Sequence, residues 1–132
     1  MSDISREELK TILLFGVHVA KLDNDMHALE NKILKRFVDA IHLSDSEKAD
    51  LLNQDISLGH GLAQITSDAA RTLLLKTMCA VASVDGTIGP EEQEFIERVV
   101  VKFGQAAFIL PKEEWKQYEE EVFTDLTQLV DT

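Results

Sequence analysis

The feature that most constrains the fold of this chain is a stretch that occurs twice, 62 positions apart. Residues 19–41 (VAKLDNDMHALENKILKRFVDAI) align without a gap on residues 81–103 (VASVDGTIGPEEQEFIERVVVKF). Identical residues occupy six of the 23 aligned positions, namely Val19/Val81, Ala20/Ala82, Asp23/Asp85, Glu30/Glu92, Arg36/Arg98 and Val38/Val100. Amphipathic helices alone would produce part of this register but would not require equal loop lengths, so the match predicts an internal duplication.

Helical periodicity dominates the rest of the chain. The apolar residues of the segment at about 28–43 have the spacing of one face of an amphipathic helix; they are Ile33, Leu34, Phe37, Val38 and Ile41. Capping-box sequences at 5–8 (SREE) and 44–47 (SDSE), and a first-turn proline at Pro90, mark further helix starts. Further helices are expected at about 6–22, from 44 toward 53, near 59–61, from about 67 to 84, from 90 to 103, and from 111 onward.

These patterns predict a single all-α domain over residues 1–132. It contains two pseudo-symmetric helix–loop–helix units (19–41 and 81–103) inside internal repeats of about 5–55 and 67–130. Neither hairpin buries its apolar face alone, so the two are expected to pack together. The residues expected to be nearly fully buried are Leu34, Val38, Cys79, Val81, Ile96 and Val100.

Charge and composition narrow the class of protein. The net charge of −11 argues against binding to nucleic acid or to an anionic membrane surface, and favours a cation or a basic protein partner. No apolar run is long enough to span a bilayer, and the first residues lack the pattern of a signal peptide. Cys79 is the single cysteine and excludes an internal disulfide. A reducing, cytoplasmic location is therefore expected.

Each copy of the repeat carries an aspartate and, seven positions later, a glutamate: Asp23 with Glu30, and Asp85 with Glu92. The aspartate falls at the end of the first helix or just past it, and the glutamate in the first turn of the second. Loop geometry decides whether these carboxylates converge. The alternative is ordinary helix capping, in which Asp85-Gly86 ends one helix and Glu92 complements the dipole of the next.

The second copy resembles the signature of the TerB-like domains, a family named for a tellurite-resistance protein and also found in a DnaJ-like co-chaperone. That pattern is roughly Ala-x-x-Asp-Gly-x-[Ile/Val]-x-x-x-Glu, and the matching residues are Ala82, Asp85, Gly86, Ile88 and Glu92. The first copy matches at Ala20, Asp23, Met26 and Glu30, with Asn24 in place of the glycine. It also has His27-Ala28 where the second copy has Gly89-Pro90.

The resemblance implies an all-α fold of about seven helices and a divalent-cation site of acidic side chains at the repeat loops. Carried over to this chain, the ligands are Asp23, Glu30, Asp85 and Glu92. Four converging carboxylates would repel one another unless a cation or protons offset the charge. Oxygen ligands favour a hard ion, Ca²⁺, Mg²⁺ or Mn²⁺. Helix capping and solvation remain the alternative reading of these residues.

The expected function is that of a non-catalytic acidic domain that binds a divalent cation and takes part in a stress-related assembly. The alternative is a helical protein–protein interaction module that holds no ion. An enzyme is not expected, because no nucleophile, base and orienting group occur together. The acidic run that begins at Asp23 fails as an EF-hand, since Leu34 stands where a bidentate glutamate is required. The four histidines lack zinc-ligand spacing.

Overall fold

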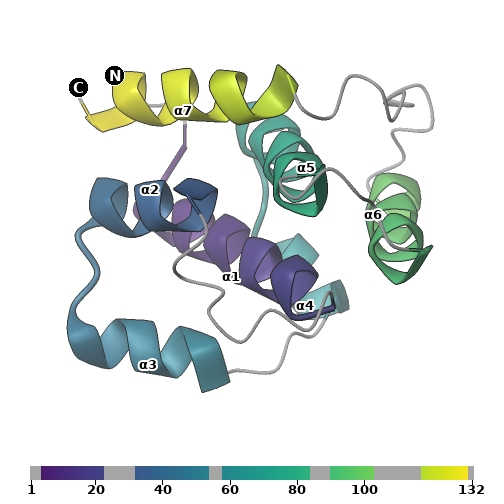
Figure 1. The fold of residues 1–132 in the computed structure, drawn as a ribbon, viewed down its shortest axis with the longest axis horizontal. Helices are drawn as coiled ribbons and strands as arrows, with labels where there is room; N and C mark the ends of the chain where they lie inside the picture. The colour runs from purple at the N-terminus through teal and green to yellow at the C-terminus, as the bar shows by residue number, and fades with distance from the viewer. Residues whose placement is uncertain (1–3, 23–31, 54–57, 84–89, 103–116, 131–132) are drawn as a thin grey trace.

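The computed structural model describes residues 4–22, 32–53, 58–83, 90–102 and 117–130, and every regular element in these ranges is an α-helix (Figure 1). In chain order the helices are α1 (Arg6–Leu22), α2 (Lys32–Ile41), α3 (Asp45–Asn53), α4 (Leu58–Ala63), α5 (Asp68–Ser83), α6 (Pro90–Lys102) and α7 (Gln117–Val130). The all-α class with about seven helices is confirmed. Of the helices in these ranges, none is long and apolar enough to cross a membrane.

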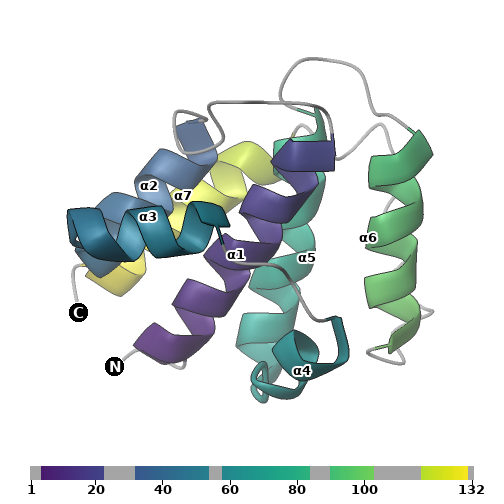
Figure 2. The ribbon, with the colours of Figure 1, turned by 90° about the horizontal axis from the view of Figure 1, so that it is seen from below.

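Helices α1 and α5 pack against each other at the centre of the molecule, and their first residues, Arg6 and Asp68, are separated by the 62 positions of the sequence repeat. Helix α2 contacts α1 and α5, and α6 contacts α5 and α1. The central pair lies between α2 on one side and α6 on the other (Figures 1 and 2). The contact of α4 with α6 corresponds to that of α7 with α2, because α4 shifted by 62 positions falls within α7.

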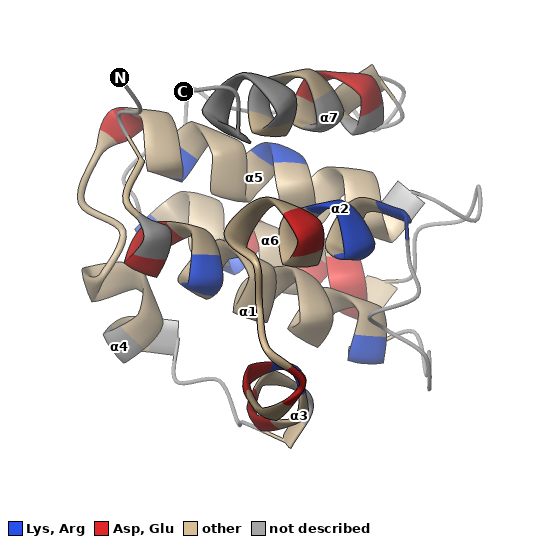
Figure 3. Ribbon diagram, turned by 90° about the vertical axis from the view of Figure 1, so that its left-hand side faces the viewer, with Lys and Arg blue, Asp and Glu red and all other residues tan. Residues whose placement is uncertain are grey.

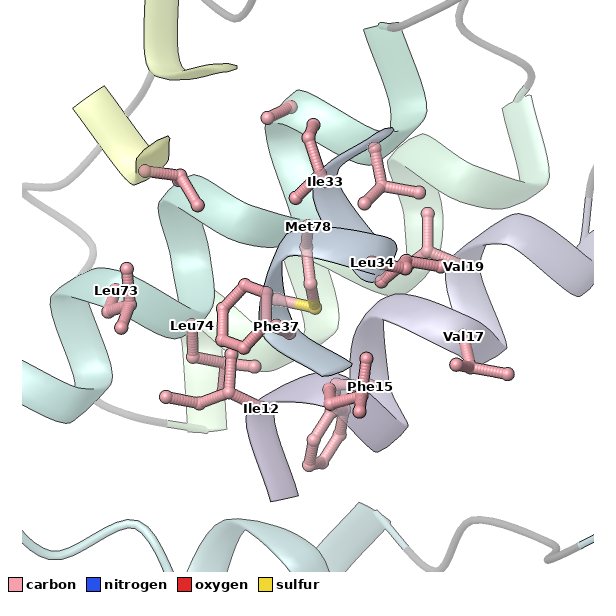
Figure 4. Packing of buried hydrophobic residues seen from close by; sticks show 14 of the residues in the cluster. Ile12, Phe15, Val17, Val19, Ile33, Leu34, Phe37, Leu73, Leu74 and Met78 are labelled. Carbon is pink, nitrogen blue, oxygen red and sulfur yellow. The ribbon is translucent and has the colours of Figure 1, made fainter. Parts of the chain in front are cut away.

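The core forms where α1, α2 and α5 meet, and their side chains interlock there (Figure 4). Phe15, Phe37 and Met78, one from each helix, are fully buried. Five of the residues expected to be buried are buried, namely Leu34, Val38, Cys79, Val81 and Ile96. Burial raises the pKa of the Cys79 thiol, which agrees with its role as a small core hydrophobe.

The expectation for Val100 is wrong, because this residue is only partly buried. Its counterpart in the first repeat, Val38, is 7% exposed. The difference follows from the helices that cover the two hairpins. Within the part of the chain that the structure describes, α2 packs against the 14-residue α7, whereas α6 contacts the six-residue α4 at the corresponding place.

The two central helices begin in the same way. The hydroxyl oxygen of Ser5 accepts a hydrogen bond from the backbone N–H of Glu8 (3.1 Å), and that of Ser67 accepts one from Ala70 (3.2 Å). Ser5 and Ser67 are 62 positions apart, as are Glu8 and Ala70. The structural register of the repeat therefore extends back to the N-caps of α1 and α5.

The Glu8 carboxylate connects these two helix starts. Its Oε1 accepts a hydrogen bond from the backbone N–H of Ser5, closing the capping box of α1. Its Oε2 accepts three more at 3.1–3.2 Å, from the N–H groups of Thr66 and Ser67 and from the Ser67 hydroxyl. Burial alone would raise the pKa of Glu8, but the hydrogen bonds from Ser5, Ser67 and Thr66 outweigh burial and hold the pKa below its ordinary value.

The second helix ends two residues earlier than the sequence predicts, at Ile41 and not Leu43. His42 has a left-handed backbone (φ 54°), and the Leu43 N–H donates to the Val38 carbonyl at 3.3 Å. This is the geometry of a Schellman ending, in which the left-handed position is usually glycine. Because histidine occupies it here, the sequence carried no clear stop signal.

A glycine allows the helices of the core to approach closely. A Cβ atom placed on Gly16 of α1 would lie 2.6 Å from Leu34 Cδ2 of α2 and 3.6 Å from Thr77 Cγ2 of α5. Leu34 and Thr77 are fully buried and have little room to move. Gly59 of α4 is the opposite case, because nothing lies within 4 Å of a Cβ placed there.

Replacing Glu8 with Gln is expected to lower the free energy of unfolding by about 1.5–3 kcal/mol at pH 7, because an amide presents N–H groups to donors that now face a carboxylate oxygen. Since the folded pKa of Glu8 is lowered, its contribution is present above the ordinary pKa of 4.5 and is lost as pH falls through the folded value. Urea unfolding between pH 3 and pH 7 measures both effects. Glu47→Gln, in the more exposed capping box of α3, is the control and should change stability less. Equal losses in the two variants would contradict the bridging role of Glu8.

Gly16→Ala is expected to destabilise the protein by about 1 kcal/mol net. Overpacking against Leu34 opposes folding by about 1–3 kcal/mol, which exceeds the gain in helix propensity of about 1 kcal/mol. Gly59→Ala meets no neighbour and should stabilise by about 0.5–1 kcal/mol. Chemical denaturation should therefore show a lower free energy of unfolding for Gly16→Ala and a higher one for Gly59→Ala. Stabilisation by both would show that α1 and α2 tolerate a wider separation.

Candidate functional site

Of the four carboxylates predicted to form a site, the described ranges include one, Glu92. It lies in the first turn of α6 and is 2% exposed. Asp23, Glu30 and Asp85 lie outside the described residues. The structure therefore locates the helix ends between which these three residues occur, together with the environment of Glu92.

Those helix ends lie at one end of the molecule. Helices α1 and α5 run in a similar direction, and their C-terminal ends, Leu22 and Ser83, are at the top of Figure 2. The N-terminal ends of α2 and α6, Lys32 and Pro90, face the same side. The last carbonyl groups of α1 and α5 and the first turns of α2 and α6 therefore surround one region of the surface.

Glu92 belongs to the inward face of α6. It shares that face with Phe95, Ile96 and Val99, which recur at helical spacing and are buried. A glutamate that only complemented the helix dipole would remain in water, as the neighbouring Glu91 does. Glu92 has an interaction partner, as expected for a carboxylate removed from solvent. Glu92 is therefore not a solvated first-turn carboxylate like Glu91, and Glu8 shows that a buried first-turn glutamate can also serve as a helix cap.

Three rings hold this part of α6 against α1. The ring centroids of His18 and Phe95 are 4.6 Å apart, and those of Phe15 and Phe95 are 6.1 Å apart. Burial lowers the pKa of His18, and the positive charge of Lys21 lowers it further. From the sequence, the histidines are considered only as zinc ligands. The sequence does not reveal this ring contact, because His18 and Phe95 are 77 positions apart.

The remaining candidates for a site are few. Within the described ranges, no three side chains of His, Cys, Asp or Glu are grouped so that they could hold a metal ion. A surface depression lies on the outward side of α6, lined by Glu94, Glu97, Arg98, Val101 and Lys102. Its lining contains two carboxylates and two cationic side chains around Val101.

Comparison of the chain with protein-family models, with curated proteins and with solved structures gives no match.

The titration of His18 tests the packing of α6 on α1. Its folded pKa is expected below the ordinary 6.5, so the neutral ring stabilises the fold above that pH and the contribution decreases as pH falls below it. NMR titration of the assigned ring protons measures the value. Lys21→Gln should raise the pKa of His18 by removing a nearby positive charge, whereas the more distant Lys48→Gln should leave it unchanged. A wild-type pKa of 6.5 or above would mean that the ring is solvated.

Proposed function

We propose that this protein is a non-catalytic cytoplasmic domain that binds a divalent cation between its two repeat loops. The proposed ligands are Asp23, Glu30, Asp85 and Glu92. The observation that carries the proposal is the arrangement of the flanking helices, because the ends of α1, α2, α5 and α6 that adjoin the two loops lie at one end of the molecule (Figure 2). When two hairpins pack in this way, their equivalent loops are expected on the same side of the molecule.

The burial of Glu92 also supports a cation site. The Glu92 side chain is 2% exposed, so it faces the neighbouring helices and not bulk water. The C-terminal carbonyl groups of α1 and α5 offer oxygen ligands on the same side of the molecule, although the first turns of α2 and α6 there carry the opposite partial charge. Carboxylate and carbonyl oxygens together are the ligands of Ca²⁺, Mg²⁺ and Mn²⁺. A role in a stress-related assembly comes from the resemblance of the second repeat to the TerB-like signature.

The alternative function is a helical interaction module that holds no ion. The specific observation in its favour is the net charge of −11, with acidic side chains such as Asp45, Asp50 and Glu120 exposed on the described helices. Such a surface favours a basic protein partner by steering its approach. In this reading Asp85 and Glu92 are local features of the helix ends and have no shared ligand.

Thermal unfolding with and without divalent ions separates the two functions. Millimolar Ca²⁺, Mg²⁺ or Mn²⁺ should raise Tm relative to a chelator, because binding to the native state alone stabilises by RT ln(1 + [L]/Kd), about 2.7 kcal/mol at 100 times Kd. This corresponds to several degrees for a chain of 132 residues. Asp85→Asn combined with Glu92→Gln should abolish the ion-dependent rise. The ion response of this variant, and not its ion-free stability, separates the two functions, because removing like charges stabilises whereas Gln at position 92 loses the interaction of a buried carboxylate.

The matched control is Glu91→Gln, which removes the exposed carboxylate next to Glu92 in the same helical turn. It should keep the ion-dependent rise in Tm. Asp23→Asn with Glu30→Gln should remove the rise as the second-repeat variant does, because one ion is shared by both loops. A wild type whose Tm does not respond to any of the three ions would leave the interaction module as the function.

A further inference from the structure

The outward faces of α2 and α6 carry opposite charges at equivalent positions of the repeat. Lys32 and Lys35 of α2 correspond, at the 62-residue offset, to Glu94 and Glu97 of α6. All four side chains are exposed. Among exposed side chains, α2 has three cationic residues and one carboxylate, whereas α6 has three carboxylates, since Glu92 is buried, and two cationic residues. The duplicated helices therefore share inward apolar faces but differ in the sign of their outward charge.

The two faces point away from each other. Helices α2 and α6 lie on opposite sides of the central α1–α5 pair in both views (Figures 1 and 2). Figure 3, which faces the α2 side, shows the Lys and Arg residues on that helix. Lys32 and Lys35 of one molecule therefore cannot reach Glu94 and Glu97 of the same molecule. Complementary pairing of the two faces requires two copies of the chain.

The α6 face also has features that suit a contact. Glu94, Glu97 and Val101 line the surface depression on this helix together with Arg98 and Lys102, which lie beside the two glutamates. Val101 is 72% exposed, and among the described residues it is the large hydrophobic side chain that is left in water. Its counterpart in α2 is Asp39, so the apolar side chain occurs on the acidic face alone. Covering Val101 with the lysine stems of another helix would remove apolar surface from water.

We propose that the basic face of α2 in one copy docks on the acidic face of α6 in a second copy. The contact joins different surfaces of the two partners, so it is heterologous and leaves one α2 face and one α6 face free. Association therefore continues head to tail beyond a dimer, as a ring or a chain. The contact depends on few exposed charge pairs and is weak and sensitive to salt.

Sedimentation velocity of the full chain over a range of protein concentrations tests the proposal. In about 0.1 M salt, where the Debye length is about 10 Å, the wild type should sediment faster as its concentration rises. In about 1 M salt, where the Debye length is about 3 Å, it should sediment as the monomer. A wild type that stays monomeric in both conditions at high concentration would overturn the proposal.

Charge reversal on one face at a time sharpens the test. Glu94→Lys with Glu97→Lys changes the net charge of −11 by +4, so general repulsion between copies decreases. If repulsion alone governed association, this variant would associate more strongly than the wild type. The proposal requires the opposite, namely a monomer at concentrations where half of the wild type is associated. Glu7→Lys with Asp50→Lys, on the exposed surfaces of α1 and α3, makes the same charge change and should not dissociate the assembly.

Mixing complementary variants gives the decisive result. Lys32→Glu with Lys35→Glu makes both faces acidic, and this variant should be monomeric by itself. Mixed in equal amounts with the Glu94→Lys, Glu97→Lys variant, it should associate again, because each α2 face now meets an α6 face of opposite charge. Circular dichroism of each variant establishes that it is folded. Two folded variants that remain monomeric when mixed would contradict an α2–α6 contact.

Discussion

The packing of α1 against α5 is the constraint on which the rest of the structure depends. Both helices are apolar along the faces that meet, and their side chains form the centre of the core with those of α2. Gly16 lets α2 lie close to this pair, since a methyl group there would collide with Leu34. At the N-terminal end, the carboxylate of Glu8 accepts hydrogen bonds from the starts of both helices, so their relative position is set by polar contacts as well as by packing.

This central pair determines where a site can form. Because α1 and α5 run in a similar direction, the loops that follow them begin at the same end of the molecule, and α2 and α6 begin there too (Figure 2). The region combines carbonyl ends of two helices with first turns of two others. Glu92 lies on the buried face of α6, one turn before Phe95, whose ring contacts Phe15 and His18 of α1. The proposed site would be formed by helix ends and not by a cavity in the core.

The two hairpins of the sequence repeat are more alike in their interior positions than on their surfaces. Inward positions exchange one apolar residue for another, as Ile33 and Phe95 or Leu34 and Ile96, because close packing tolerates little else. Outward positions face water and tolerate a change of sign, as at Lys32 and Glu94, although Arg36 and Arg98 keep theirs. Two similar hairpins in one chain thereby present unlike surfaces, which is the condition for a contact between different faces of identical molecules.

The sequence by itself determined the helices, most of their described ends and their inward faces, because periodicity, caps and the first-turn proline Pro90 act within one or two turns of helix. The helix start predicted at Pro111 lies outside the described residues. It also predicted the Ser5–Glu8 capping box. Only the tertiary structure decided that Glu8 also bonds Thr66 and Ser67, that Glu92 is buried, and that Val100 lies at the edge of the core. These properties depend on which helices are neighbours. The surface that a neighbouring helix covers is set by packing between segments far apart in the chain.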